Sequence, residues 1–334
     1  MDWALTLTIL IIVIALVFDF TNGFHDAANA IATSVGTRAL KPRTALIMAA
    51  VCNFVGAFLG QEVAKTIQSI TNPPPGYAGL LLVGAALFGA IAWNLTTWYF
   101  GLPSSSSHAL IGGIVGASIV AGSLIEWSTV WDKVVIPMVT SPVVGLILAF
   151  LFMRLIVQIF QNRNVTKVNE GFRHAQTVSA AAMALGHGLQ DAQKTMGIIV
   201  LALVSMGYLG ADAGIPGWVV FAAAAAISLG TAIGGKKIMT TLGRRVIHLT
   251  PARGFAAETV ASAILYTTAF VFHAPISTTQ VITGSILGAG VEKRFKAVRW
   301  NVGVRILWAW VLTLPMAALL AAFCYWIVNL FAHI

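Results

Sequence analysis

Two groups of polar residues interrupt apolar stretches of this chain and could bind ions. The first recurs every three or four residues, so a helix would carry it on one face; its members are Asn22, Asp26, Asn29 and Thr33. The second has the same spacing and consists of His187, Asp191 and Lys194. A carboxylate can bind or exchange a cation, while amides, hydroxyls and an ammonium can orient an anion. Both groups are therefore candidates for a site that handles ions of both signs.

The two aspartates are the most informative members of these groups. In a membrane, an ionised carboxylate costs about 2.5–3.5 kcal/mol on insertion scales, so it normally faces a partner or a water-filled cavity. We expect Asp26 and Asp191 to hold a cation. Two alternatives stay open: both aspartates lie at the membrane edge as helix caps, or Asp191 simply forms an ion pair with Lys194.

Two hydroxyl-rich segments form a second candidate feature. Pro103 and Pro275 each break a helical pattern and are followed by hydroxyl residues and a new apolar run, which is typical of a helix N-terminus. The hydroxyl residues are Ser104, Ser105, Ser106 and Ser107 in the first segment, and Ser277, Thr278 and Thr279 in the second. The free N–H groups and the positive end of the helix dipole at such a terminus favour an anion. The alternative is a pair of ordinary capped loops at the surface.

Three further polar residues accompany these segments. His25 and His108 could transfer a proton or donate hydrogen bonds, and Gln280 takes the place of His108 in the second segment. A single histidine inside a membrane protein is more often a satisfied packing residue than a proton relay, so this alternative is kept for each histidine.

The composition defines the class of protein in which these residues act. The chain has 334 residues, of which 58% are hydrophobic and 9% charged. Soluble domains carry about 25% charged residues, so this chain is expected to be an all-α membrane protein in contact with a lipid bilayer. The net charge of +9 lies in short loops, which indicates membrane topology and no nucleic-acid partner. Strands are not expected, because the apolar runs are unbroken.

Ten apolar stretches follow one another along the chain. They are 3–22, 43–61, 78–100, 107–124, 134–160, 175–206, 218–234, 255–272, 280–291 and 300–331. Most reach the roughly 20 residues that a membrane-spanning helix needs. The runs 107–124 and 280–291 are short, and 175–206 is interrupted by polar residues, so we expect broken or re-entrant segments. Alternate loops are rich in lysine and arginine, which with ten spans places both termini outside the cell membrane.

The chain also contains an internal duplication. Asp26 matches Asp191, Ser107 matches Thr279, and paired glycines and prolines match in the same order, with offsets of 165 to 174 residues. We expect a first repeat over 1–160, a short cytoplasmic linker over 161–174 and a second repeat over 175–334. Five segments per repeat would place the two copies upside down relative to each other. Inverted repeats are typical of secondary transporters, whose site lies between the repeats near the midplane.

These motifs together resemble the inorganic phosphate transporter (PiT) family. The segments that carry the resemblance are Gly23-Phe24-His25-Asp26-Ala27-Ala28-Asn29-Ala30, Asp191-Ala192-Gln193-Lys194 and the two Pro-x-Ser/Thr segments. The resemblance covers nearly the whole chain. It implies phosphate transport driven by sodium in some members and by protons in many bacterial ones, a homodimer, and neither enzymatic activity nor a cofactor. Gln190 and Gln280 depart from the family pattern, in which Asn and His are usual.

The sequence therefore predicts a symporter that imports inorganic phosphate or a metal–phosphate complex. Phosphate would lie between the two Ser/Thr helix starts, with Asn29, Gln190 and Lys194 orienting or neutralising it. Asp26 and Asp191 would hold the coupling cation, including sodium if it is used. Lys194 replaces Asn29 of the first repeat and supplies a fixed positive charge but no oxygen ligand, which favours a proton over sodium.

Three alternatives to phosphate symport remain. A sulfate or other oxyanion symporter of the same family would need the same tetrahedral site. An intramembrane serine hydrolase would use Ser107 or a neighbour as nucleophile and a histidine as base, although the duplication of the hydroxyl segment argues against it. A passive anion channel would differ from a symporter by needing no cation gradient.

Overall fold

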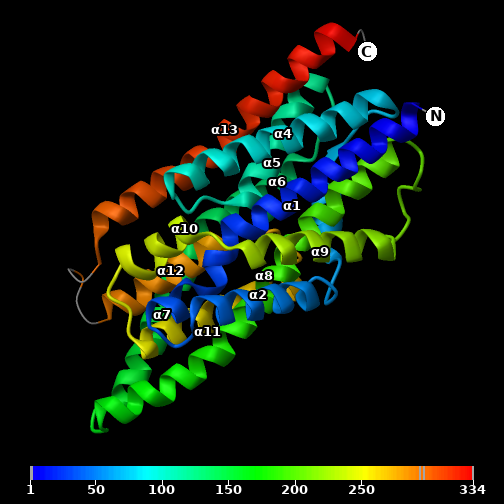
Figure 1. Cartoon of the computed structure of the whole chain (residues 1–334). Coiled ribbons are helices and arrows are strands. Elements are labelled where there is room, and N and C mark those ends of the chain that lie inside the picture. The colour runs from blue at the N-terminus through cyan, green and yellow to red at the C-terminus, as the bar shows by residue number, and fades with distance from the viewer. Residues whose placement is uncertain (1–2, 293–294, 296–297, 333–334) are drawn as a thin grey trace.

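The computed structural model describes residues 3–292, 295 and 298–332, and it is almost entirely helical (Figure 1). In the first half, the elements are α1 (Trp3–Gly36), α2 (Pro42–Gly56), α3 (Glu62–Gln68), β1 (Thr71–Asn72), α4 (Tyr77–Phe100), α5 (Ser106–Ala121), β2 (Leu124–Ile125), α6 (Trp127–Val130), the π-helical turn η1 (Trp131–Val135) and α7 (Ile136–Phe160). In the second half, they are α8 (Val165–Ser205), α9 (Gly217–Ile233), α10 (Lys236–Thr240), η2 (Thr241–Arg245), α11 (Pro251–Thr267), η3 (Thr268–Phe272), α12 (Thr278–Val291) and α13 (Trp300–Ala332).

Fewer helices are long enough to cross a membrane than the ten apolar stretches suggest. Among the described residues, five helices pass by length and composition: α1, α4, the continuous run from α6 to α7, the run from α11 to η3, and α13. A sixth is added if the bent pair of α9 and the helix after it forms one span. At 1.5 Å per residue, the 15, 16 and 14 residues of α2, α5 and α12 fall short of a roughly 30 Å hydrocarbon core. The fold is thus all-α with several short helices.

Two sequence-based expectations about local structure are corrected. The polar segment from Gly186 to Asp191 does not interrupt its helix, because α8 runs unbroken for 41 residues and begins inside the expected linker at Val165. Strands do occur: in the part of the chain that the structure describes, one antiparallel pair forms, in which Thr71 is paired with Ile125. The pair is only two residues long on each side, which is why alternation could not reveal it.

The breaks in the fold lie instead before α5 and α12, as the two prolines predict. Ser105 caps α5 by accepting a hydrogen bond from the backbone N of His108 at 3.2 Å. Ser277 caps α12 in the same way, from the backbone N of Gln280 at 3.3 Å. Both expected N-caps are therefore confirmed.

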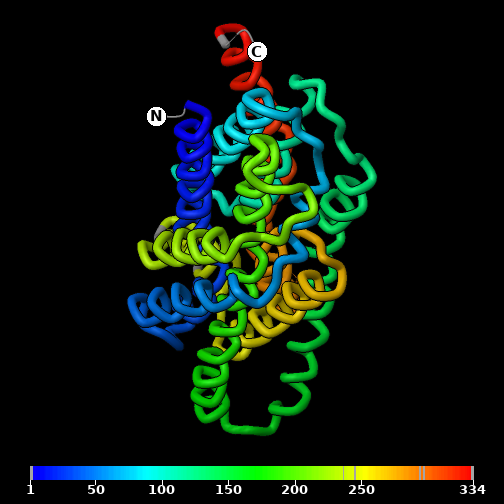
Figure 2. The backbone as a smooth tube through the Cα atoms, turned by 90° about the vertical axis from the view of Figure 1, so that its right-hand side faces the viewer, coloured from blue at the N-terminus to red at the C-terminus, as the bar shows by residue number. Residues whose placement is uncertain are grey.

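The same packing contacts occur twice in the molecule. A Cβ on Gly23 would lie 2.4 Å from the carbonyl oxygen of Ile227 in α9, and one on Gly188 would lie 2.2 Å from that of Asn53 in α2. These glycines allow α1 to cross α9, and α8 to cross α2, at backbone contact. Figure 2 shows that α1 descends from the N-terminus while α8 rises from the turn after α7, so these two matching helices run in opposite directions.

The buried apolar residues form two large clusters, one toward each end of the bundle. One cluster contains Phe18 of α1 and Met196 of α8, and the other contains Ile31 of α1 and Met183 of α8. The central segments of α1 and α8 therefore lie where the two clusters meet. Those segments carry the two aspartates that the sequence singles out.

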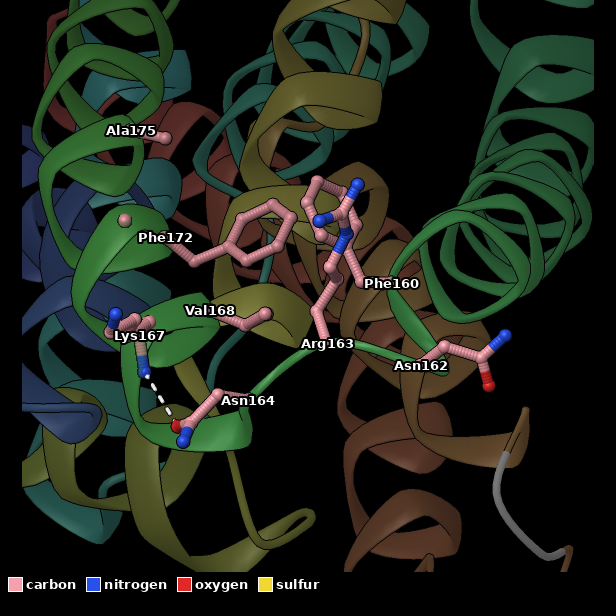
Figure 3. Close-up of a pocket in the computed structure, with 9 residues that line it drawn as sticks. Phe160, Asn162, Arg163, Asn164, Lys167, Val168, Phe172 and Ala175 are labelled. Carbon is pink, nitrogen blue, oxygen red and sulfur yellow. Dashed lines mark hydrogen bonds between the residues drawn. The ribbon is translucent and has the colours of Figure 1, made fainter.

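The turn between α7 and α8 lies at the far end of the bundle from the start of α1 and the end of α13 (Figures 1 and 2). A cavity of 750 Å³ lies at this turn, and Figure 3 shows residues that line it, among them Phe160, Arg163 and Lys167. Asn164 caps α8 by accepting hydrogen bonds from the backbone N of Thr166 and Lys167. Most residues that line the cavity are exposed, and none of them is one of the buried aspartates.

Candidate functional site

The start of α5 and the start of α12 meet at Asp26 of α1. The hydroxyl of Ser106, at the first position of α5, donates to Asp26 Oδ2 at 2.9 Å. The hydroxyl of Thr279 in the first turn of α12 donates to Asp26 Oδ1 at 3.4 Å. One carboxylate thus links two helix N-termini that are far apart in the sequence.

Asn29, one turn after Asp26, strengthens this link. Its amide Nδ2 donates to Thr279 Oγ1 at 2.8 Å and lies 3.3 Å from Thr278 Oγ1. A side chain of the first half therefore holds the start of α12, which belongs to the second half.

Lys194 makes the reciprocal connection from the second half. Its ammonium donates to the hydroxyl of Ser107 in α5, to Asp191 in its own helix, and to the carbonyl oxygen of Ile276 at 3.2 Å. Lys194 is fully buried, so it does not extend toward lipid headgroups. The ion pair with Asp191, foreseen as an alternative, is present, and the ammonium also contacts the hydroxyl segment.

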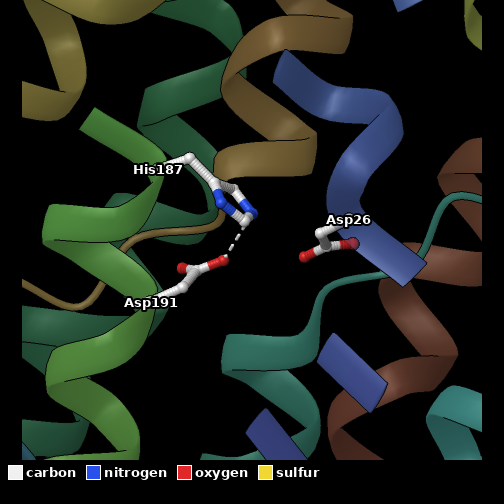
Figure 4. Close-up of side chains that lie close together, drawn as sticks. All are labelled: Asp26, His187 and Asp191. Carbon is white, nitrogen blue, oxygen red and sulfur yellow. Dashed lines mark ion pairs between the residues drawn. The ribbon is translucent and has the colours of Figure 1, made fainter. Parts of the chain in front are cut away.

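Asp191 lies opposite Asp26 and has His187 as a further neighbour. His187 Nε2 is 3.0 Å from Asp191 Oδ2, one turn away on α8. One ligand atom each from Asp26, His187 and Asp191 lies within 4.8 Å of the other two, and all three residues are buried (Figure 4). This set could hold a cation between α1 and α8.

His25 and Gln190 occupy matching positions beside the two aspartates and make matching contacts. His25 Nε2 lies 3.2 Å from the hydroxyl of Thr97 in α4. Gln190 Nε2 donates to the hydroxyl of Thr268, just after α11, at 3.0 Å. The imidazole of His25 and the amide of Gln190 thus each form a hydrogen bond with a threonine hydroxyl. We infer that this hydrogen bond is the role that the two matching positions share.

Ser104, His25 and Asp26 form a string that resembles a hydrolase triad. Ser104 Oγ lies 3.3 Å from His25 Nε2, and His25 Nδ1 lies 2.6 Å from Asp26 Oδ1. The hydroxyl of Thr97 competes for the same His25 nitrogen, at 3.2 Å. All of these groups are buried, and the matching position in the second half holds Gln190, which cannot act as a base. The contact is therefore better explained as packing between α1 and α4.

Every site residue that the sequence predicted is at most 2% exposed, which excludes surface loops for these segments. The residues are His25, Asp26, Asn29, Ser104, Ser105, Ser106, Ser107, His108, Gln190, Asp191, Lys194, Ser277, Thr278, Thr279 and Gln280. They do not all meet. Ser105 and Ser277 serve as helix caps, and within the described residues His108 Nδ1 and Gln280 Oε1 have no hydrogen-bond partner.

Three polar residues outside the predicted site also lie near these helices. Asn53 Oδ1 is 3.1 Å from His187 Nδ1, and so fixes that ring from α2. Glu258 of α11 accepts hydrogen bonds from Thr33 and from Ser179. Asp19 of α1 is fully buried. Asp19 and Glu258 could have been found from the sequence, because each is an acidic residue inside an apolar stretch.

The geometry agrees with what sequence comparison finds. Residues 22–321 match the Phosphate transporter family. The chain belongs to this family. It is 48% identical over 332 residues to a probable low-affinity inorganic phosphate transporter of Bacillus subtilis, with 99% of each chain covered. It is also 45% identical over 338 residues to a protein of the same description from Rhizobium meliloti, covering 99% of this chain and 100% of the relative.

A solved structure has the same fold. It is described as the sodium-dependent phosphate transporter, and it superposes with a TM-score of 0.86 at 25% identity over 97% of this chain and 99% of its own. The PiT resemblance is thereby confirmed, and the chain is an all-α membrane protein of a transporter family, whose named relatives are transporters and not enzymes.

Proposed function

We propose that this protein imports inorganic phosphate together with a cation, with the substrate between the starts of α5 and α12. The observation that carries the proposal is the convergence of both helix starts on Asp26, through Ser106 and Thr279. Each helix start presents unpaired N–H groups, hydroxyls and the positive end of a dipole, which suit an oxyanion. The hydroxyls bind without adding charge, so the anion can leave again.

A cation must accompany phosphate in this site. Asp26 and Asp191 lie on opposite sides of the same small region, and among the lysines and arginines that the structure describes, Lys194 alone forms an ion pair with one of them. Phosphate would add one or two negative charges. Like charges a few ångströms apart in a low-dielectric interior repel by several kcal/mol, so binding and transport of phosphate require a proton or a metal cation.

We propose the proton as the coupling ion. Lys194 stands in the second repeat where Asn29 stands in the first, and its ammonium contacts Asp191 and Ser107. A fixed ammonium would replace one bound cation and reduce the need for sodium. Sodium is the alternative, because the relative of known structure is described as sodium-dependent. A metal–phosphate complex is a second alternative, in which the divalent ion would supply the charge near Asp26 and Asp191.

Alternating access would follow from two inverted repeats, 1–160 and 175–334, moving around the shared site in the cell membrane. The opposite directions of α1 and α8 and their reciprocal contacts support this arrangement (Figure 2). Both termini would lie outside, and the protein would act as a homodimer. Crosslinking of the purified protein in lipid nanodiscs tests the dimer.

Uptake of labelled phosphate into proteoliposomes tests the substrate. We expect unlabelled phosphate and arsenate to compete and sulfate to compete weakly, because arsenate has the protonation states of phosphate. Stronger competition by sulfate than by phosphate would assign the protein to the sulfate branch. Uptake that is unchanged when magnesium is chelated would exclude the metal–phosphate complex.

A further inference from the structure

Asp19 is a buried acidic residue that the proposed site does not use. It lies in α1, two helical turns before Asp26, which places it about 10 Å along the helix toward the N-terminus. The side chain is 0% exposed, and neither carboxylate oxygen has a well-formed hydrogen bond with any residue that the structure describes. This differs from Asp26, Asp191 and Glu258, each of which has several polar partners.

The surroundings of Asp19 contain little that could balance a negative charge. On α8, the hydroxyl of Thr195 lies beside it, and the charged groups whose field reaches it are Asp191 and Lys194. The neighbouring helices α4 and α9 contain no charged residue or histidine. On α1 itself, the nearest titratable groups are His25 and Asp26, about two turns away.

The ammonium of Lys194 contacts groups other than Asp19. It contacts Asp191, Ser107 and the backbone of Ile276, and it makes no hydrogen bond to Asp19. A buried carboxylate without a partner is far more costly than a neutral carboxyl group. A proton on Asp19 would remove this cost in the arrangement described here.

We propose that Asp19 is the residue that binds the coupling proton, and that Lys194 links this proton to phosphate. The inference rests on the proposed phosphate symport. A proton on Asp19 leaves Lys194 at Ser107, where its positive charge can bind the phosphate that arrives between α5 and α12. The negative charge of the phosphate in turn disfavours an ionised Asp19, so that the proton is retained. After phosphate leaves, Lys194 can turn from Ser107 toward Asp19 and stabilise its carboxylate, and the proton departs to water.

The balance of charges supports the cycle. Asp19 holds one proton while phosphate is bound and releases it after phosphate leaves, with no bond formed or broken elsewhere. Because α1 starts on the side proposed to be outside, Asp19 lies between that side and Asp26. Binding of the two ligands is then reciprocally coupled, since each favours the other by the same factor.

Measuring two modes of transport, exchange and accumulation, distinguishes a residue that binds the coupling proton from one with a merely structural role. Exchange of labelled for unlabelled phosphate at equal pH on both sides needs no net proton movement, whereas accumulation under an inward proton gradient does. We expect Asp19→Asn in proteoliposomes to keep exchange within about threefold of wild type and to lose accumulation. Asp19→Glu should accumulate phosphate, and Asp212→Asn, a change at an exposed loop carboxylate, should match wild type in both modes.

Asp19→Ala serves as a second neutral variant if Asp19→Asn does not fold, because the matching position of the second repeat holds Ala184.

Calorimetry of phosphate binding in buffers of different ionisation enthalpy adds a readout independent of transport. At a pH at which free Asp19 is partly ionised, wild type should take up more protons per phosphate than the neutral variants, up to about one, as expected from removing one titrating group. Normal proton-driven accumulation by either neutral variant, or equal proton uptake, would overturn the proposal. Failure of wild type to transport phosphate would instead refute the proposed function.

Discussion

Asn29 of α1 and Lys194 of α8 occupy matching positions in the two halves, and each donates a hydrogen bond to a hydroxyl of the other half. Asn29 contacts Thr279 of α12, and Lys194 contacts Ser107 of α5. The two helix starts are thus held by reciprocal contacts of similar geometry but different charge. This difference in charge is what gives the two halves of the site different chemistry.

Removing the charge of either aspartate tests their role as cation ligands. Asp26→Asn and Asp191→Asn keep the shape of the side chain but lose a charge-assisted interaction of about 1.5–3 kcal/mol, which corresponds to roughly a 10- to 150-fold weaker affinity. We expect both variants to fold and to lose concentrative phosphate uptake. Uptake is measured with labelled phosphate in proteoliposomes of equal protein content. Normal accumulation by either variant would remove that aspartate from the mechanism.

Substituting Lys194 tests the source of the fixed charge. In Lys194→Asn, the second half acquires the amide that the first half has at Asn29, and Asp191 loses its ammonium partner. We expect phosphate uptake either to be lost or to become stimulated by sodium, because a mobile cation can then fill the vacant position. Uptake is compared in sodium and choline media. Wild-type uptake that requires sodium and ignores a pH gradient would contradict the tethered-cation hypothesis.

A methyl group added at Gly188 tests the close crossing of α8 and α2. A Cβ there would lie 2.2 Å from the carbonyl oxygen of Asn53, so the helices must separate. We expect Gly188→Ala to destabilise the protein by about 1–3 kcal/mol, as overpacking does. Gly171→Ala is the matched control, since it lies in the same helix and its Cβ would have no neighbour within 4 Å. The melting temperature in detergent should fall for the first variant alone.

Cysteine labelling tests the proposed topology. In a background without Cys52 and Cys324, a cysteine at position 164 reports on the turn between α7 and α8, and one at position 329 reports on the end of α13. We expect Asn164→Cys to react only from the cytoplasm and Asn329→Cys only from outside. Reaction of both from the same side would be incompatible with both the predicted orientation and the inverted repeats.

The sequence predicted the parts of the site that depend on short-range pattern. Pro103 with Ser105, and Pro275 with Ser277, predicted two helix starts because an N-cap is a local interaction, and the structure contains both caps. The duplication also predicted that Asp26 and Asp191 occupy equivalent positions in the two halves. The same reasoning could not show that Asp26 contacts both helix starts, because this depends on how three distant segments, α1, α5 and α12, pack.

Other features were missed for physical reasons. Hydropathy marks apolar segments but does not distinguish a spanning helix from a short one, so ten stretches correspond to only five or six candidate spans among the described residues. Asp19 and Glu258 were hidden because one acidic residue barely changes the character of an apolar run. Their different surroundings, unpartnered for Asp19 and hydrogen-bonded for Glu258, appear only once the helices pack.

The most direct test of cation-coupled phosphate transport is uptake of labelled phosphate by proteoliposomes under imposed ion gradients. With equal phosphate on both sides, an inward proton gradient in the absence of sodium should drive phosphate above its starting concentration inside, and dissipating the gradient should return it. Liposomes without protein should show neither change. Phosphate that only equilibrates under every imposed proton or sodium gradient would contradict symport and indicate a passive pathway.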